Sequence, residues 1–238
     1  MGRDVIVACD FAGAAECLEF LEHFRKEDRL PYVKIGMELF YAAGPEMVRT
    51  VKERGHKVFL DLKLHDIPNT VEKAMAVLAR LGVDMCNLHA GGAIPMMEGA
   101  LRGLTAGAAD AGLPRPILLA VTQLTSTSQE VMERDIRIHE PVADVVCAYA
   151  KNAMTAGLDG VVCSPLEAGM VKDACGKGFL TVTPGVRFAD GDKGDQARVT
   201  TPEKAKEIGS DYIVVGRPIT AAPDPVAAYR RCVAEFCD

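Results

Sequence analysis

Short apolar segments alternate with amphipathic segments along the chain. Eight of the apolar segments are rich in Val, Ile and Leu. They read VIVAC (5–9), YVKIG (32–36), KVFLDLK (57–63), MCNLH (85–89), PILLAVTQL (116–124), GVVCS (160–164), LTVTPGV (180–186) and YIVVG (212–216). Strands that are apolar on both faces and separated by helices are typical of a parallel sheet covered by helices. Eight such units predict a single (β/α)8 TIM barrel, with an open doubly wound sheet as the alternative.

The segments between the strands show helical periodicity. In the first of them, Cys17, Leu21 and Phe24 recur at the spacing of one helix face. In the third of them, which follows the strand at 57–63, Pro68 and then Asn69, as a candidate N-cap, indicate a helix start. Open doubly wound sheets that bind dinucleotides usually carry a G-x-G-x-x-G motif after the first strand. This chain has no such motif there, since VIVACDFAGAAE (5–16) contains a single glycine. This absence favours the barrel.

One strand carries two charges within its apolar pattern. Neighbouring residues of a strand point to opposite faces, so Asp61 and Lys63 share a face with Phe59, whereas Leu60 and Leu62 lie on the other. The apolar face must contact the helices, so the two charges are expected to point into the barrel. Opposite charges are costly to bury unless they are paired, and a purely structural ion pair is one interpretation.

Three further charged residues favour a catalytic network instead. Lys34 lies within the second strand and needs a buried carboxylate, which Asp61 on the adjacent strand can supply. Asp10 follows the first strand, and Asp66 follows Lys63 in the loop before the next helix. All five are expected at the end of the barrel where active sites form. An alternating chain of lysines and aspartates there keeps each member ionised.

The loops after strands seven and eight carry arginines. Arg187 begins a long polar loop after the seventh strand, and Gly216 and Arg217 end the eighth. Barrel enzymes commonly bind phosphate in these two loops. Gln196, within the polar loop, is a candidate to close over the phosphate. After the fifth strand, residues 125–126 can hydrogen-bond a polar ring or cap the following segment.

Composition limits the class of partner. The chain has 238 residues, and 27 basic against 33 acidic residues give a net charge of -6, which disfavours binding to nucleic acids and membranes. A small phosphorylated molecule remains possible where a local pocket is basic. No apolar run approaches the roughly 20 residues of a membrane-spanning helix, so a cytoplasmic location is expected. No linker divides the chain, so residues 1–238 are expected to form one domain.

The eight cysteines are expected to be reduced and structural. None forms a C-x-x-C pair, and no histidine cluster lies near one at the spacing of zinc ligands. Most lie within apolar runs, where cysteine acts as a small hydrophobic residue. The sequence therefore predicts no metal site.

The motif DLKLHDIPNTV (61–71) resembles the orotidine 5'-phosphate decarboxylase family, in its bacterial, monofunctional form. VACD (7–10), VKIG (33–36), LTS (124–126), PGVR…DQ.R (184–198) and VVGRPIT (214–220) extend the resemblance over essentially the whole chain. The resemblance implies a (β/α)8 barrel that converts orotidine 5'-monophosphate to uridine 5'-monophosphate and CO2 in de novo pyrimidine biosynthesis. It also implies that neither metal nor organic cofactor takes part.

The resemblance assigns roles to the matching residues. Lys63 would stabilise the carbanion left by the departure of CO2 and would protonate C6. Asp61 would lie beside the substrate carboxylate, and Lys34 would orient the network. Asp66 would be the fourth catalytic residue. The substrate would be bound by Asp10, Lys34, Asp61, Ile67, Thr70, Thr125, Ser126, Pro184, Arg187, Gln196, Gly216 and Arg217. Asp66, Ile67 and Thr70 would reach into a neighbouring subunit's site, so an active homodimer is implied.

Two other functions fit parts of the pattern. A metal-dependent sugar-phosphate decarboxylase or aldolase of the same barrel superfamily shares the D-x-K-x-x-D core, but HDIPNT (65–70) and the DQ.R loop favour the nucleotide enzyme. A noncatalytic nucleotide-binding barrel is the other possibility. It has no need of two inward lysines, so an enzyme is the stronger hypothesis.

Overall fold

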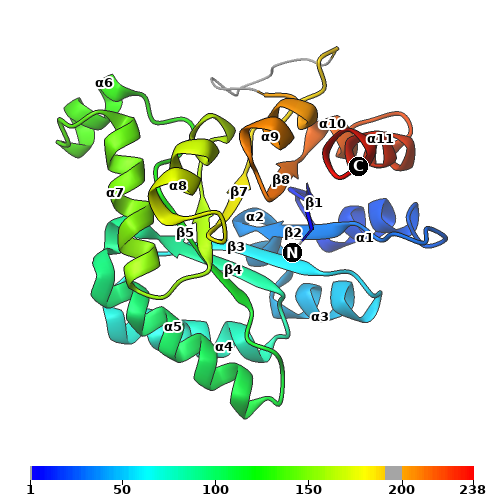
Figure 1. The fold of residues 1–238 in the computed structure, drawn as a ribbon. Coiled ribbons are helices and arrows are strands. Elements are labelled where there is room, and N and C mark those ends of the chain that lie inside the picture. The colour runs from blue at the N-terminus through cyan, green and yellow to red at the C-terminus, as the bar shows by residue number, and fades with distance from the viewer. Residues whose placement is uncertain (1, 191–199) are drawn as a thin grey trace.

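Eight parallel strands close into a barrel (Figure 1). The computed structural model describes residues 2–190 and 200–238. The strands are β1 (Asp4–Ala8), β2 (Tyr32–Gly36), β3 (Val58–Leu64), β4 (Met85–His89), β5 (Ile117–Val121), β6 (Gly160–Val162), β7 (Leu180–Thr183) and β8 (Tyr212–Val215). β8 pairs with β1, from Asp4 opposite Tyr212 to Val7 opposite Val215. The predicted (β/α)8 barrel is confirmed, and the open sheet is wrong because this pairing leaves no sheet edge.

Helices surround the barrel and cover its outer face (Figure 1). The longer ones are α1 (Ala14–Glu22), α2 (Met37–Ala43), α3 (Pro45–Glu53), α4 (Pro68–Arg80), α5 (Ala93–Asp110), α7 (Val142–Thr155), α8 (Ala168–Cys175), α9 (Pro202–Ile208) and α11 (Pro225–Phe236). Shorter turns are η1 (Ala90–Gly92), α6 (Gln129–Val131), the π-helix η2 (Met132–Ile136), η3 (Pro165–Glu167) and α10 (Arg217–Thr220).

Two apolar cores lie on the two faces of the strands. The smaller fills the barrel interior and consists of Ile6, Ala8, Tyr32, Phe59, Met85, Leu119, Val182, Tyr212 and Val214. The larger lies between strands and helices and includes Leu60 and Leu62 of β3. The alternation predicted for β3 is therefore confirmed: Phe59 faces the interior with the two charged residues that follow it, and the leucines face the helices.

The expected helix starts and ends need small corrections. In α1, Cys17 and Leu21 are buried as predicted, but the helix ends at Glu22, so Phe24 is buried in the segment beyond it. α4 begins at Pro68 itself with Ile67 as its N-cap, so Asn69 is not the cap. Proline suits the first helical position because it lacks the N–H that would otherwise go unpaired and its φ is already helical.

The cysteines are all unpaired thiols. Cys9, Cys17, Cys86, Cys163 and Cys232 are buried, and the other three are partly buried. Burial raises the pKa of Cys86 to about 12, which keeps it protonated and unreactive at neutral pH. These surroundings agree with a structural role.

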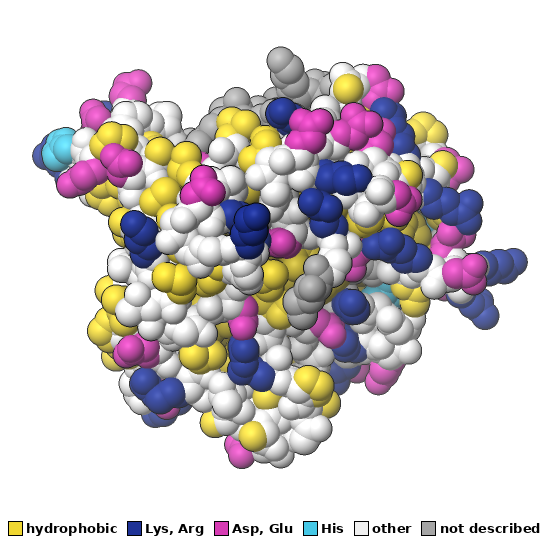
Figure 2. All heavy atoms as spheres, viewed as in Figure 1, with side chains coloured by type: hydrophobic (Ala, Val, Ile, Leu, Met, Phe, Trp, Pro, Cys, Tyr) yellow, Lys and Arg dark blue, Asp and Glu magenta, His cyan; other side chains and the backbone are white. Residues whose placement is uncertain are grey.

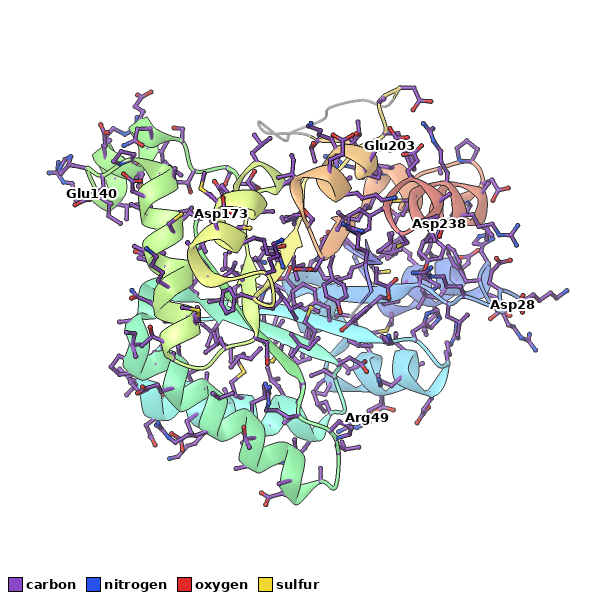
Figure 3. The ribbon with its side chains drawn as sticks, in the orientation of Figure 1. Asp28, Arg49, Glu140, Asp173, Glu203 and Asp238 are labelled. Carbon is purple, nitrogen blue, oxygen red and sulfur yellow. The ribbon has the colours of Figure 1, made fainter. Side chains whose placement is uncertain are left out.

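The charged surface is mixed in sign. On the face drawn in Figure 2, Lys and Arg side chains are interspersed with Asp and Glu. Figure 3 shows Asp28, Glu140 and Glu203 pointing outward from the fold. None of the helices within residues 2–190 and 200–238 combines the length and the apolar character that crossing a membrane requires.

Candidate active site

Four of the predicted charged residues form one connected chain at the carboxyl ends of β1, β2 and β3. Lys34 Nζ lies 2.8 Å from Asp10 Oδ1 and 3.4 Å from Asp61 Oδ2. Lys63 Nζ lies 2.7 Å from the other oxygen of the same carboxylate, Asp61 Oδ1. Positive and negative groups therefore alternate from Asp10 through Lys34 and Asp61 to Lys63.

Burial and neighbouring charges shift the pKa values of Lys34 and Asp61 in opposite directions, and the neighbouring charges have the larger effect. Lys34 is 7% exposed and Asp61 8%. Burial acts to raise the pKa of Asp61, but the charges of Lys34 and Lys63 outweigh it and lower that pKa below its ordinary value. Burial acts to lower the pKa of Lys34, but Asp61 and Asp10 outweigh it and raise that pKa. Both groups therefore stay ionised at neutral pH.

The predicted fifth member, Asp66, does not join the network within one chain. Its side chain is exposed in the loop before α4, and its Oδ1 accepts a hydrogen bond from the backbone N–H of Ile67 at 2.6 Å. Among the described residues, the ion pair of Lys63 is with Asp61. Asp66 therefore lies at the expected end of the barrel but outside the ion-paired network of its own chain, and its expected place in a neighbouring subunit's site stays a prediction.

Two residues at the network escaped the sequence prediction. Asn87 of β4 donates from Nδ2 to Asp61 Oδ1 at 2.7 Å and accepts at Oδ1 from the Lys63 backbone N–H at 2.9 Å. A lone amide inside the apolar strand MCNLH was the available signal. Gly36 of β2 leaves the space that the Lys34–Asp10 pair occupies. A glycine ending a strand carries no such signal by itself.

Two adjoining cavities open beside the network. The first, of about 250 Å³, is lined by Lys34, Asp61 and Lys63 together with the predicted Thr125, Ser126 and Pro184 and with apolar residues of the barrel interior. The second, of about 320 Å³, is lined by Asp10, Arg187, Gly216 and Arg217. Lys34, Pro184 and Val214 line both cavities. Together they form an elongated site with an apolar end and a basic end.

At the basic end, two arginines line one cavity and lie near enough for their charges to interact. Arg187 is buried, and its guanidinium donates to the carbonyl oxygen of Val186 at 2.9 Å. Burial and the neighbouring charge of Arg217 both lower the pKa of Arg187. Two confined guanidinium groups that repel each other are stabilised by a bound phosphate. Gln196, predicted to close over that phosphate, lies outside the described residues.

Ile67 and Thr70, expected to act with Asp66, are also exposed, at the start of α4. They line neither cavity of their own chain. Their expected role in a neighbouring subunit therefore stays a prediction. Within the described residues, no group of three or more His, Cys, Asp or Glu side chains is arranged to hold a metal ion.

The fold and the site are typical of a class of protein, the (β/α)8-barrel enzymes that bind phosphorylated substrates at the carboxyl ends of their strands. The family model described as "Orotidine 5'-phosphate decarboxylase / HUMPS family" matches residues 3–232. The chain belongs to this family.

Relatives with established names agree over nearly the full length. The chain is 56% identical over 231 residues to the orotidine 5'-phosphate decarboxylase of Lactococcus lactis subsp. lactis (strain IL1403), covering 97% of each chain. It is 53% identical over 230 residues to that of Bacillus cereus (strain Q1), covering 97% of this chain and 95% of the relative. The crystal structure of the Lactobacillus acidophilus orotidine 5'-phosphate decarboxylase superposes with a TM-score of 0.89 at 44% identity, covering 99% of this chain and 100% of that one. The resemblance inferred from the motifs is confirmed.

Proposed function

We propose that the buried lysine–aspartate network decarboxylates orotidine 5'-monophosphate, with Lys63 at the reacting carbon. The activity is orotidine 5'-phosphate decarboxylation, a carboxy-lyase reaction of pyrimidine biosynthesis, as in the relatives that share over half of its residues. The observation that carries the assignment to these residues is the ion-paired series Asp10–Lys34–Asp61–Lys63, whose members line the two cavities.

The reaction places a lone pair on C6 of the pyrimidine. The bond from C6 to the carboxylate carbon breaks, CO2 leaves, and the electron pair stays on C6. A fixed cation at that carbon stabilises the developing charge more than any other single group can. Lys63 lines the cavity and is held by Asp61, so its ammonium is in place before the reaction begins. Lys63 then donates a proton to C6 and is reprotonated from solvent.

The rest of the site holds the substrate. Arg187, Gly216 and Arg217 bind the phosphate at the basic end, and Thr125 and Ser126 bind the polar edge of the pyrimidine near the apolar end. Lys34 and Asp10, which line the second cavity at the basic end, hold the ribose hydroxyls. Binding energy from the remote phosphate is then available to place C6 against Lys63.

Replacing Lys63 tests this assignment. We expect Lys63→Ala to lower turnover of orotidine 5'-monophosphate by about 10³-fold or more, because both the fixed charge and the proton are lost. Binding of uridine 5'-monophosphate should remain, since the phosphate grip is intact. The loss of ultraviolet absorbance during turnover, with chelator present, measures the rate.

The matched control is Lys57→Ala, an exposed lysine just before the opposite end of β3. It should turn over substrate at the wild-type rate. Near-normal turnover by Lys63→Ala would sink the proposed role. Activity that disappears with chelator and returns with a divalent cation would favour the metal-dependent sugar-phosphate enzyme instead.

We also propose that two copies of the chain share their active sites. Asp66, Ile67 and Thr70 are exposed in the loop and first helical turn that follow β3, and Ile67 is 65% exposed although it is large and apolar. Tyr41 of α2, which follows the neighbouring strand, is 74% exposed. Large apolar side chains left uncovered at this end support an interface with a second copy.

Complementation tests the shared site. In a heterodimer of Lys63→Ala and Asp66→Ala chains, one site contains an intact Lys63 and receives an intact Asp66. Random mixing of two inactive homodimers should therefore restore about a quarter of wild-type activity, since half of the dimers then carry one intact site. No recovery after verified exchange of subunits would mean that Asp66 acts within its own chain or does not act.

We place the enzyme in the cytoplasm and treat residues 1–238 as one domain. Both proposals rest on the sequence, which shows no long apolar run and no linker.

A further inference from the structure

The pairing of β3 with β4 is irregular beside the catalytic lysine. Leu60 pairs with Cys86 and Leu64 pairs with Leu88, so residues 61–63 of β3 lie opposite a single residue of β4, Asn87. At the end of this irregular stretch, Lys63 has φ of 51°, in the left-handed region. Lysine rarely adopts this conformation because its Cβ crowds the backbone, so surrounding contacts must hold it there.

Asn87 supplies those contacts. Its Oδ1 accepts the hydrogen bond from the Lys63 backbone N–H at 2.9 Å, and its Nδ2 donates to Asp61 Oδ1 at 2.7 Å. The Asn87 side chain is buried, with the residue 1% exposed, so water does not compete for either bond. One amide therefore spans from the backbone of the lysine to the carboxylate that pairs with its ammonium.

We propose that Asn87 is a positioning residue for decarboxylation: its amide holds the irregular turn of β3 that aims Lys63 and orients the Asp61 carboxylate. This inference rests on the proposed function, because it acts through Lys63. Asn87 lines neither of the two cavities, so it acts without touching the substrate. A strand irregularity that redirects a side chain beside an active site is a known device.

Only a neutral side chain that both donates and accepts satisfies both contacts. Leucine of similar size offers neither bond and leaves the Lys63 N–H and one Asp61 oxygen without this partner. An ionised aspartate accepts from Lys63 but cannot donate to Asp61, and it adds a like charge against it. A protonated aspartic acid both donates and accepts, so it reproduces the amide.

The test compares Asn87→Leu and Asn87→Asp with the wild type. We expect Asn87→Leu to lower kcat for orotidine 5'-monophosphate by about 100-fold while KM changes less than about threefold, because small misplacement of a reacting group is costly and the phosphate grip is elsewhere. Asn87→Asp should recover part of this loss as pH falls from 8 to 5, relative to the wild type at each pH. Burial beside Asp61 favours the protonated form of the introduced carboxyl there.

Leu88→Ala is the control for stability, since Leu88 is buried on the same strand but faces the helices. It should lower Tm and leave kcat of the folded enzyme near the wild-type value. Asn87→Leu with kcat within threefold of wild type would overturn the inference, as would equal relative kcat of Asn87→Asp across the pH range. If Lys63→Ala retains activity, the proposed function fails. If Lys63→Ala is inactive and Asn87→Leu is normal, only the role of Asn87 fails.

Discussion

At the scale of single residues, the network depends on a glycine that leaves room for it as well as on its charged side chains. A Cβ added at Gly36 would lie 2.9 Å from Asp10 Oδ1 and 3.1 Å from Lys34 Nζ. The backbone of Gly36 has an ordinary φ of -88°, so its requirement is space and not conformation. β2 therefore ends in glycine because the Lys34–Asp10 pair occupies the volume that any larger residue would take.

Gly36→Ala tests this reading. We expect kcat/KM to fall by about 10-fold to 100-fold, because Lys34 and Asp10 must move apart at the substrate. The fold should persist, since the displaced atoms are the ends of side chains. Steady-state kinetics and thermal melts measure the two effects. Gly13→Ala is the control, since nothing lies within 4 Å of its added Cβ; equal kcat/KM in both variants would contradict the argument.

At the scale of elements, α4 and α5 pack with their backbones in direct contact. A Cβ at Gly103 of α5 would lie 1.9 Å from the carbonyl oxygen of Glu72, and one at Gly107 would lie 2.3 Å from that of Ala76. α4 begins directly after the loop that carries Asp66 and Ile67. The spacing of these two helices therefore sets where the proposed shared residues lie.

Gly107→Ala is expected to destabilise the protein despite the better helix propensity of alanine. Propensity contributes about 1 kcal/mol in favour of the substitution. Forcing the helices apart costs about 1 to 3 kcal/mol, and more when backbone atoms are the obstacle. Denaturant unfolding should show a net loss of stability. Gly169→Ala in α8 is the control, because its added Cβ would meet its nearest atom at an ordinary 3.5 Å. Its stability should be unchanged or slightly higher. A loss as large as that of Gly107→Ala would refute the packing argument.

At the scale of the whole molecule, the end of the chain closes on its beginning. The ring of Tyr229 in α11 meets Phe24 at 5.7 Å between centroids, and Arg230 pairs with Glu27 at 2.7 Å. Figure 1 shows α11 beside α1, with β8 next to β1. Removing any one unit opens the sheet, so the units depend on one another.

The barrel should therefore unfold as one cooperative unit. At a fixed protein concentration, denaturation followed by far-ultraviolet circular dichroism and by tyrosine fluorescence should give coincident transitions. The chain has five tyrosines and no tryptophan, so the fluorescence reports on several units at once. Two separated transitions would contradict the assignment of residues 1–238 to one domain.

Much of the fold and part of the site were predictable because they depend on local periodicity. The period of two in VFLDLK placed Asp61 and Lys63 inward without any knowledge of neighbouring strands. The charge of Lys34 within an apolar strand required a carboxylate, and the next strand supplied it at 3.4 Å. The arginines after strands seven and eight line the same cavity because parallel strands end at one face.

The tertiary structure decided what depends on contacts between distant segments. The irregular β3–β4 pairing, the left-handed Lys63 and the two bonds of Asn87 arise from strand register, which local periodicity does not encode. The sequence by itself determined which groups face the barrel interior, because side-chain direction follows from strand geometry. Only the folded chain decided which of them touch, because distances depend on how whole strands are aligned.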